Sequence, residues 1–150
     1  MIEFDYPSLL QGERPHVYAY PLETIVAEKV EAVVKLGILN SRMKDFYDLY
    51  MIAGLFEFKG SMLANAMKAT FTHRGTAIPA EVPAGLSTEF GIASDQRWKA
   101  FLRTNGINAA PHALGVILET LRAFALPVLQ AAARDEQFDC TWRSGSGWAR

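Results

Sequence analysis

The chain has 150 residues, of which half are hydrophobic and 21% are charged, and this composition excludes an intrinsically disordered protein. The formal net charge is −1, so a polyanion such as nucleic acid would need a local basic patch. Cys140 is the only cysteine, which excludes an intramolecular disulfide and fits a reducing cytosol. We find no signal peptide and no apolar run of the roughly 20 residues that span a bilayer, and we therefore expect a cytoplasmic protein without a membrane role.

The N-terminal residues show a strand pattern. Ile2, Phe4 and Tyr6 alternate with acidic residues, and residues 16–20 are rich in aromatic and β-branched side chains. Two strands do not form an independent sheet in water. Residues 1–20 are therefore predicted to be the terminal strands of a larger sheet, and their exposed edges would favour self-association.

The rest of the chain is predicted to form five helices and one short helical turn. Gly37 favours a left-handed cap after the first helix, and Asn40 or Ser41 is a good N-cap for the second. Pro127 is expected to kink or interrupt the last helix, and the glycine/serine run at 144–147 is typical of a linker. The expected helical segments are 23–36, 42–56, 61–73, 88–91, 96–103 and 111–135.

The predicted fold class is mainly α: a helical bundle with a small N-terminal two-strand β piece. We expect two parts, the strands of residues 1–20 and a C-terminal helical domain over residues 21–150.

Lys29 interrupts an apolar stripe. It lies four residues after Ile25 and four before Val33, so helical geometry places it on the packed face. One interpretation is snorkelling, in which the stem packs and the ammonium reaches water at the edge of the core. The other is a lysine that points into a cleft and binds an anion such as a triphosphate.

Arg42, Asp45 and Asp48 stand three residues apart and share one face of the second helix. A surface Arg–Asp pair, with an acidic first turn favoured by the helix dipole, would explain this spacing. A functional alternative is that Asp45 orients Lys29, Lys44 or a metal-bound nucleotide, since carboxylates suit magnesium.

The Ala-Glu-Lys run at 27–29, followed by Asn-Ser-Arg-Met-Lys-Asp-Phe-Tyr-Asp-Leu at 40–49, resembles the second half of the AbiEii/AbiGii nucleotidyltransferase toxins. The resemblance is densest over residues 17–50. These toxins belong to type IV toxin–antitoxin and abortive-infection phage-defence systems. The resemblance implies a nucleotidyltransferase sheet domain followed by a helical domain, with a nucleoside triphosphate and magnesium in the cleft between them.

The resemblance also implies roles for individual residues. Lys29 would bind phosphate, Asp45 would be the acidic catalytic residue, and Asp48 would be its neighbouring candidate. Arg42 and Lys44 would complete the nucleotide site. The reaction would transfer a nucleotide to an acceptor such as tRNA, and a cognate antitoxin would be a partner.

One family feature is missing from the sequence. The Gly-Ser pairs at 60–61 and 145–146 are not followed by the spaced pair of metal-binding carboxylates that the family carries. The predicted strands would be a remnant of the nucleotidyltransferase α/β sheet, and Asp5 is a candidate metal carboxylate there, with Glu3 as an alternative. Because phosphoryl transfer depends on metal charge and positioning, we expect this polypeptide to be inactive on its own.

A second functional class stays open at this point. A stand-alone helical binding module for an antitoxin, for RNA or for a second copy of the chain would also fit the predicted helices and exposed strand edges.

Overall fold

A computed structural model describes residues 21–150, which hold six α-helices and a small three-stranded antiparallel sheet. This architecture confirms the predicted mainly α fold class. The N-terminal strands, their self-association and the boundary at residue 20 lie outside the described residues and stay predictions. The elements in chain order are α2 (Leu22–Leu36), the 3-10 turn η1 (Gly37–Leu39), α3 (Met43–Leu55), β1 (Phe58–Lys59), α4 (Gly60–Arg74), the 3-10 turn η2 (Ala84–Leu86), α5 (Thr88–Ala93), α6 (Asp95–Thr104), α7 (Leu114–Ala133), β2 (Thr141–Arg143) and β3 (Gly147–Ala149).

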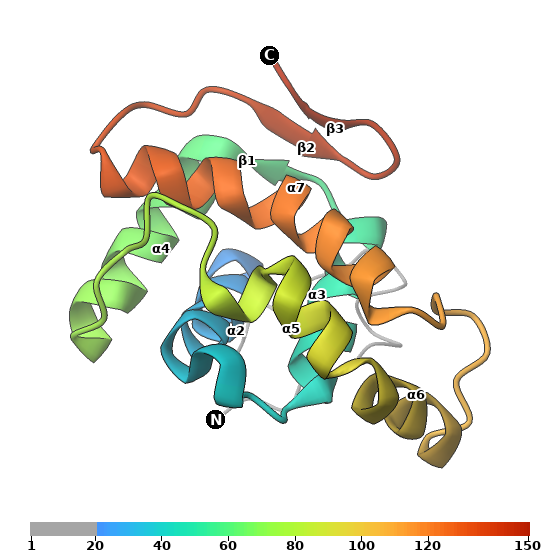
Figure 1. Ribbon diagram of the computed structural model, residues 1–150. Coiled ribbons are helices and arrows are strands. Elements are labelled where there is room, and N and C mark those ends of the chain that lie inside the picture. Colours follow the sequence, from blue (N-terminus) through green and yellow to red (C-terminus); the bar gives the residue numbers. More distant parts are fainter. Residues whose placement is uncertain (1–20) are drawn as a thin grey trace.

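Helix α7 is the central packing element. Figure 1 shows it crossing the molecule, with the strands on one side and α5 on the other. Ten of its twenty residues are buried. By length and composition α7 is also apolar enough to cross a membrane, but core helices share this property. The buried side chains assign α7 to the protein core.

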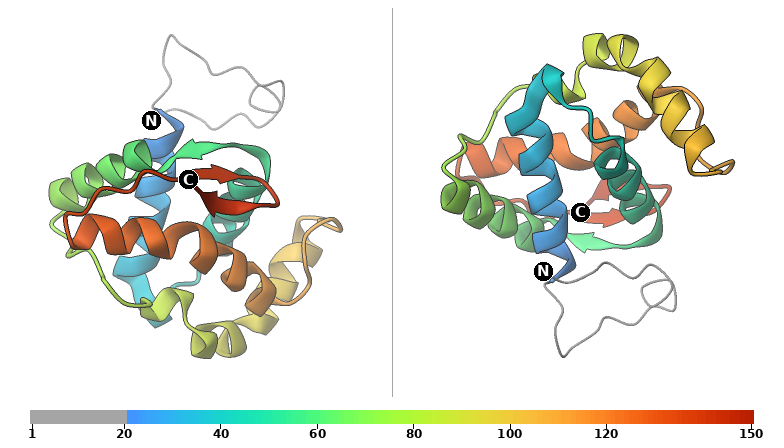
Figure 2. Two further views of the ribbon diagram at one scale, coloured as in Figure 1. Left: turned by 90° about the horizontal axis from the view of Figure 1, so that it is seen from above. Right: turned by 90° about the horizontal axis from the view of Figure 1, so that it is seen from below.

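Helices α2, α3 and α4 position the residues singled out in the sequence. Helix α2 packs along α4 and also contacts α3, while α3 and α4 both contact α7. Figure 2 shows α2 crossing beneath α7 between α4 and α3. The side chains that fill this junction include Val26, Val30, Phe46, Leu49 and Phe71, all of which are buried.

The predicted C-terminal linker is wrong. Strands β2 and β3 pair as an antiparallel hairpin, with Trp142 opposite Trp148, and β1 pairs with the other edge of β2. The glycine/serine run forms the turn of this hairpin, where Gly145 has φ +78°. Glycine adopts this backbone conformation without the steric cost of a side chain.

The helix ends agree with the predicted ends to within three residues. Gly75 ends α4 in the left-handed conformation, and Gly37 ends α2 with positive φ but an extended ψ, so it begins a 3-10 turn. Neither predicted N-cap lies at the N-cap of α3, which is Arg42. Asn40 instead accepts a hydrogen bond from the Arg42 amide through Oδ1 at 2.8 Å.

Of the kink or interruption predicted at Pro127, the interruption is wrong, because α7 continues through it to Ala133. The missing proline N–H leaves the carbonyl of Ala123 without a helical partner. Ala123 is exposed. Water can therefore satisfy this carbonyl, and the helix does not need to break.

Candidate functional site

Lys29 points from α2 to the first turns of α3. Its Nζ lies 3.3 Å from Asp45 Oδ1 and 3.1 Å from Asp48 Oδ2. About 20% of the Lys29 side chain is exposed. The structure therefore differs from simple snorkelling, because the ammonium is bound between two carboxylates at the edge of the core.

Two more cations complete this group of charges. Lys44 Nζ lies 2.8 Å from Asp48 Oδ2, and Arg42 Nε lies 3.2 Å from Asp45 Oδ2. The helical spacings of three and four residues bring both cations over the carboxylates of their own helix. We call these five side chains, Lys29, Arg42, Lys44, Asp45 and Asp48, the charge cluster.

Burial is uneven within the charge cluster. The Asp48 side chain is 2% exposed, whereas Lys44 is 70% exposed and Arg42 is 60% exposed. The two carboxylates therefore lie at the buried base of the charge cluster. The two cations of α3, Arg42 and Lys44, lie at its solvent-exposed rim. Three cations face two carboxylates, so the cluster carries an excess of one positive charge toward solvent.

One atom of the cluster keeps unused hydrogen-bonding capacity. Asp45 Oδ2 is buried and accepts no hydrogen bond from the described residues, although Arg42 Nε approaches it as an ion-pair partner. A buried carboxylate oxygen without a hydrogen bond is costly. Such atoms occur where a ligand or a water completes the site.

The charge cluster does not fit a magnesium ion by itself. Magnesium requires several oxygen ligands in octahedral geometry. Both carboxylates here are neutralised by ammonium and guanidinium groups, and residues 21–150 contain no group of three metal-ligating side chains. The donor chemistry of the cluster suits an anion better than a cation, and Asp5 lies outside the described residues.

Glu23 and Glu31 of α2 are also buried carboxylates, and neither was predicted from the sequence. Glu31 of α2 is only 1% exposed and accepts a hydrogen bond from Thr76 Oγ1 at 2.6 Å, while Arg74 lies 3.7 Å away. Glu31 follows Ala27 by four residues, so both lie on the face of α2 that packs against α4. The small side chain of Ala27 indicates that α2 approaches α4 closely. Glu31 stabilises this approach through its contacts with Thr76 and Arg74.

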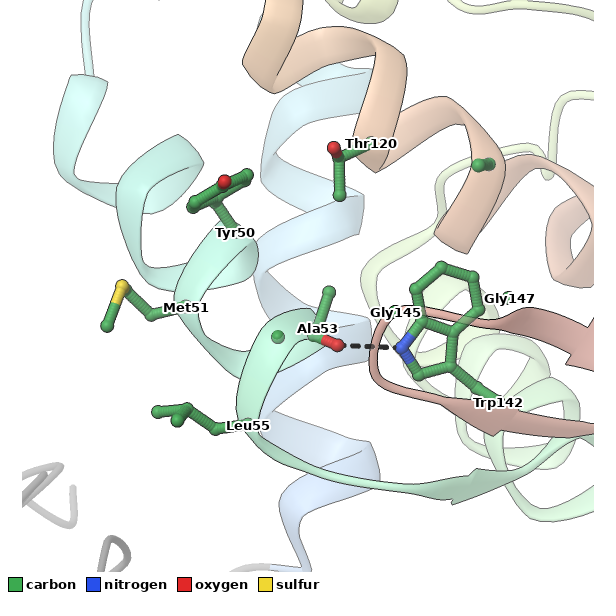
Figure 3. Close-up of a pocket in the computed structure, with 10 residues that line it drawn as sticks. Tyr50, Met51, Ala53, Leu55, Thr120, Trp142, Gly145 and Gly147 are labelled. Carbon is green, nitrogen blue, oxygen red and sulfur yellow. Dashed lines mark hydrogen bonds between the residues drawn. The ribbon is translucent and has the colours of Figure 1, made fainter. Parts of the chain in front are cut away.

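A pocket opens beside the C-terminal half of α3. It has a volume of about 540 Å³ and lies between α3, α7 and the β2–β3 hairpin. Figure 3 shows Tyr50, Met51 and Leu55 along α3, with Thr120 and Trp142 opposite them. The lining is mainly apolar. This pocket is not predictable from the sequence, because the glycine/serine run of the hairpin that closes it is typical of a linker.

Hydrogen bonds from the hairpin hold the end of α3 at this pocket. Trp142 Nε1 donates to the Ala53 carbonyl at 2.8 Å, and Ser144 Oγ donates to the Gly54 carbonyl. Both carbonyls belong to the last turn of α3, where no helical amide is available. The hairpin therefore caps the same helix whose first turns carry Asp45 and Asp48.

The comparisons with known proteins agree with the resemblance found in the sequence. The family model of the nucleotidyl transferase AbiEii toxin of type IV toxin–antitoxin systems matches residues 2–125. The charge cluster lies within this match, and the β2–β3 hairpin lies beyond it. No curated protein and no solved structure matches the chain.

Proposed function

Because the chain belongs to the AbiEii family of nucleotidyl transferase toxins of type IV toxin–antitoxin systems, we propose that the charge cluster is the phosphate-binding wall of a nucleotide site. The observation that carries this proposal is the position of the Lys29 ammonium between Asp45 and Asp48. Membership of this family implies an antitoxin partner.

Lys29 is suited to bind a triphosphate without leaving its partners. An ammonium has three N–H donors. The two aspartates take two of these donors, which fixes the direction of the third. The Lys29 ammonium would then donate this third hydrogen bond to a phosphate oxygen, while Lys44 and Arg42 offer further positive charge at the rim.

The carboxylates would act on Lys29 and on the nucleotide edge. Asp48 binds the ammonium groups of Lys29 and Lys44 at once, so it would position both lysines. Asp45, whose Oδ1 lies beside Lys29 and whose Oδ2 lies beside Arg42, would orient these two cations at the nucleotide edge. These roles need no metal ion at the cluster.

The rest of the reaction would depend on a second wall. Family enzymes are expected to use magnesium and to transfer nucleotides to an acceptor such as tRNA. The 150 residues lack the Gly-Ser turn with paired carboxylates. We propose that such a wall, from another polypeptide segment, would hold the magnesium, and that the chain alone does not catalyse transfer.

A binding measurement tests the cluster directly. We expect Lys29→Ala to weaken binding of a nucleoside triphosphate to the 150-residue chain by about tenfold to a hundredfold, because a charge-assisted hydrogen bond contributes about 1.5–3 kcal/mol. Equilibrium dialysis with labelled ATP, GTP, CTP and UTP measures this change. Lys35→Ala is the matched control, since Lys35 is an exposed lysine at the end of the same helix.

A transfer assay tests the role in the reaction. The chain is joined to the N-terminal sheet domain of a complete family member, and transfer of labelled nucleotide to tRNA is measured. We expect Lys29→Ala and Asp45→Asn to abolish transfer and Lys35→Ala to leave it unchanged. Full transfer by the Lys29→Ala fusion would remove this lysine from the mechanism.

A further inference from the structure

The pocket of about 540 Å³ and the charge cluster share one helix. Lys44, Met51 and Leu55 are separated by seven and four residues, so they lie on one face of α3, where Tyr47 between them packs against Phe101 of α6. Lys44 belongs to the charge cluster, and Met51 and Leu55 line the pocket. Met51 lies seven residues after Lys44, which is about 10 Å along the helix axis.

The walls of the pocket offer a flat apolar ligand a suitable surface. Tyr50 and Met51 contribute from α3, with the Met51 side chain pointing away from Trp142, and Trp142 contributes from the hairpin (Figure 3). The Trp142 N–H is already bound to Ala53, and its ring, only 6% exposed, packs against Phe124 and Trp148. Tyr50, which is half-buried, is therefore the ring on which a ligand would stack. Ligand pockets of small molecules have volumes of this order and mainly apolar linings.

A few polar groups lie at the edges of the pocket. Tyr50 and Thr120 bring hydroxyl groups that can donate or accept. Ala123 of α7 also lines the pocket, four residues before Pro127, which has no N–H for the Ala123 carbonyl. The pocket therefore combines the Tyr50 ring with hydroxyl groups that can hydrogen-bond the amino groups and ring nitrogens of a nucleobase.

We propose that this pocket binds an unstacked nucleobase of a single-stranded nucleic acid, whose backbone runs along α3 toward Lys44 and Arg42. Base stacking on aromatic side chains next to cations that follow the backbone is the usual mode of single-strand binding. The positive rim at one end of the same helix face favours a polyanion over an apolar peptide. This inference rests on the proposed function, since it assigns the acceptor strand of the transfer reaction to this face of α3.

Two variants test the pocket in the full chain. Tyr50→Leu removes the stacking ring, and Ala123→Leu narrows the pocket from an exposed position. We expect each to weaken binding of a fluorescent single-stranded RNA octamer about tenfold, as measured by anisotropy at low salt. Val116→Leu is the matched control, because Val116 is an exposed residue of the same helix and does not line the pocket. Thermal unfolding of all three variants confirms that they are folded.

The outcomes separate this inference from the proposed function. The inference holds if both pocket variants lose RNA binding while their affinity for a nucleoside triphosphate is unchanged and Lys29→Ala loses triphosphate affinity. It is overturned if the pocket variants bind RNA as well as Val116→Leu does, whatever happens at Lys29. It is also overturned if they lose affinity for free AMP but not for RNA, because the pocket would then take a mononucleotide. Binding of an apolar peptide in competition with an environment-sensitive dye, without RNA binding, would likewise refute it.

Discussion

Two residues of one ion pair are expected to differ in their importance for stability. Asp48 and Lys44 are 2.8 Å apart, yet the Asp48 side chain is 2% exposed and Lys44 is 70% exposed. Asp48 also holds Lys29. An exposed ion-pair partner contributes little because water screens it, whereas the loss of a buried carboxylate leaves a nearby cation without compensation.

We therefore expect Asp48→Asn to lower the free energy of unfolding by about 2 kcal/mol and Lys44→Ala to lower it by less than about 0.5 kcal/mol. Urea unfolding followed by circular dichroism measures both values. Equal losses in the two variants would show that Asp48 is not a buried anchor of the charge cluster.

At the scale of elements, the C-terminal hairpin stabilises the helix that carries the carboxylates. Trp142 and Ser144 cap the last carbonyls of α3, and Trp148 Nε1 donates to the Phe124 carbonyl of α7 at 2.9 Å. The Phe124 ring also packs edge-on against Trp142 with centroids 4.9 Å apart. The hairpin thus joins α3 to α7, although it lies beyond the part of the chain that the family model matches.

We expect Trp142→Phe, which keeps an aromatic ring and removes the N–H, to lower the free energy of unfolding by about 1 kcal/mol. Hydrogen exchange of the amides in the last turns of α3 should become faster than in the unmodified chain. If exchange in α3 is unchanged while the hairpin itself loosens, the indole does not cap this helix.

Local patterns predicted the helices, but the hairpin depends on distant residues. The capping glycine of α4, the Asn-Gly stop after α6 and the apolar spacing of α2 are all local signals, and the structure places these helix ends within one or two residues of the predicted ones. Strand β2, by contrast, pairs with β1 more than 80 residues earlier in the chain. A short glycine/serine run does not indicate a pairing with a strand so far away, so the local pattern predicts only a linker.

In the candidate site, too, local patterns were predictable from the sequence and long-range contacts were not. Two local patterns predicted the residues of the site. These are the position of Lys29 on an apolar face and the three-residue spacing of Arg42, Asp45 and Asp48. The contact of Lys29 with the two aspartates depends on how α2 packs against α3, and sequence periodicity does not specify this packing. The double role of Asp48, with two lysines on one carboxylate oxygen, was therefore visible only in the structure.

At the scale of the whole molecule, one carboxylate connects the peripheral helix α6 to the central helix α7. Asp95 begins α6, pairs with Lys99, and accepts a hydrogen bond through Oδ1 from the amide of Leu114, the first residue of α7, at 3.0 Å. The sequence predicted Asp95 as a cap or first-turn residue of its own helix. The structure adds that it satisfies a free amide at the N-terminus of the longest helix.

This arrangement is expected to make the folded state less stable at acid pH, where Asp95 becomes protonated. The hydrogen bond from Lys99, followed by the one from the Leu114 amide, lowers the pKa of Asp95 below its ordinary value of 3.8. A carboxyl group whose pKa is lower in the folded state stabilises that state at pH values above its unfolded pKa. This contribution is lost as the pH falls through the folded pKa. The Asp95 side chain is 26% exposed, so solvent screening limits the effect to less than about 1 kcal/mol.

We expect Asp95→Asn to be less stable than the unmodified chain at pH 7, and we expect this difference to shrink between pH 4 and pH 2. The asparagine keeps an acceptor for the Leu114 amide but loses the charge that Lys99 stabilises, so only the pH-dependent part of the contribution disappears. Urea unfolding at pH 7, 4, 3 and 2.5 measures the difference, with Asp139→Asn on the exposed tail as the control. A constant difference between the two proteins across this range would mean that the Asp95 charge, paired with Lys99 of the same helix, does not contribute to stability, and that Asp95 acts only through its hydrogen bond to Leu114.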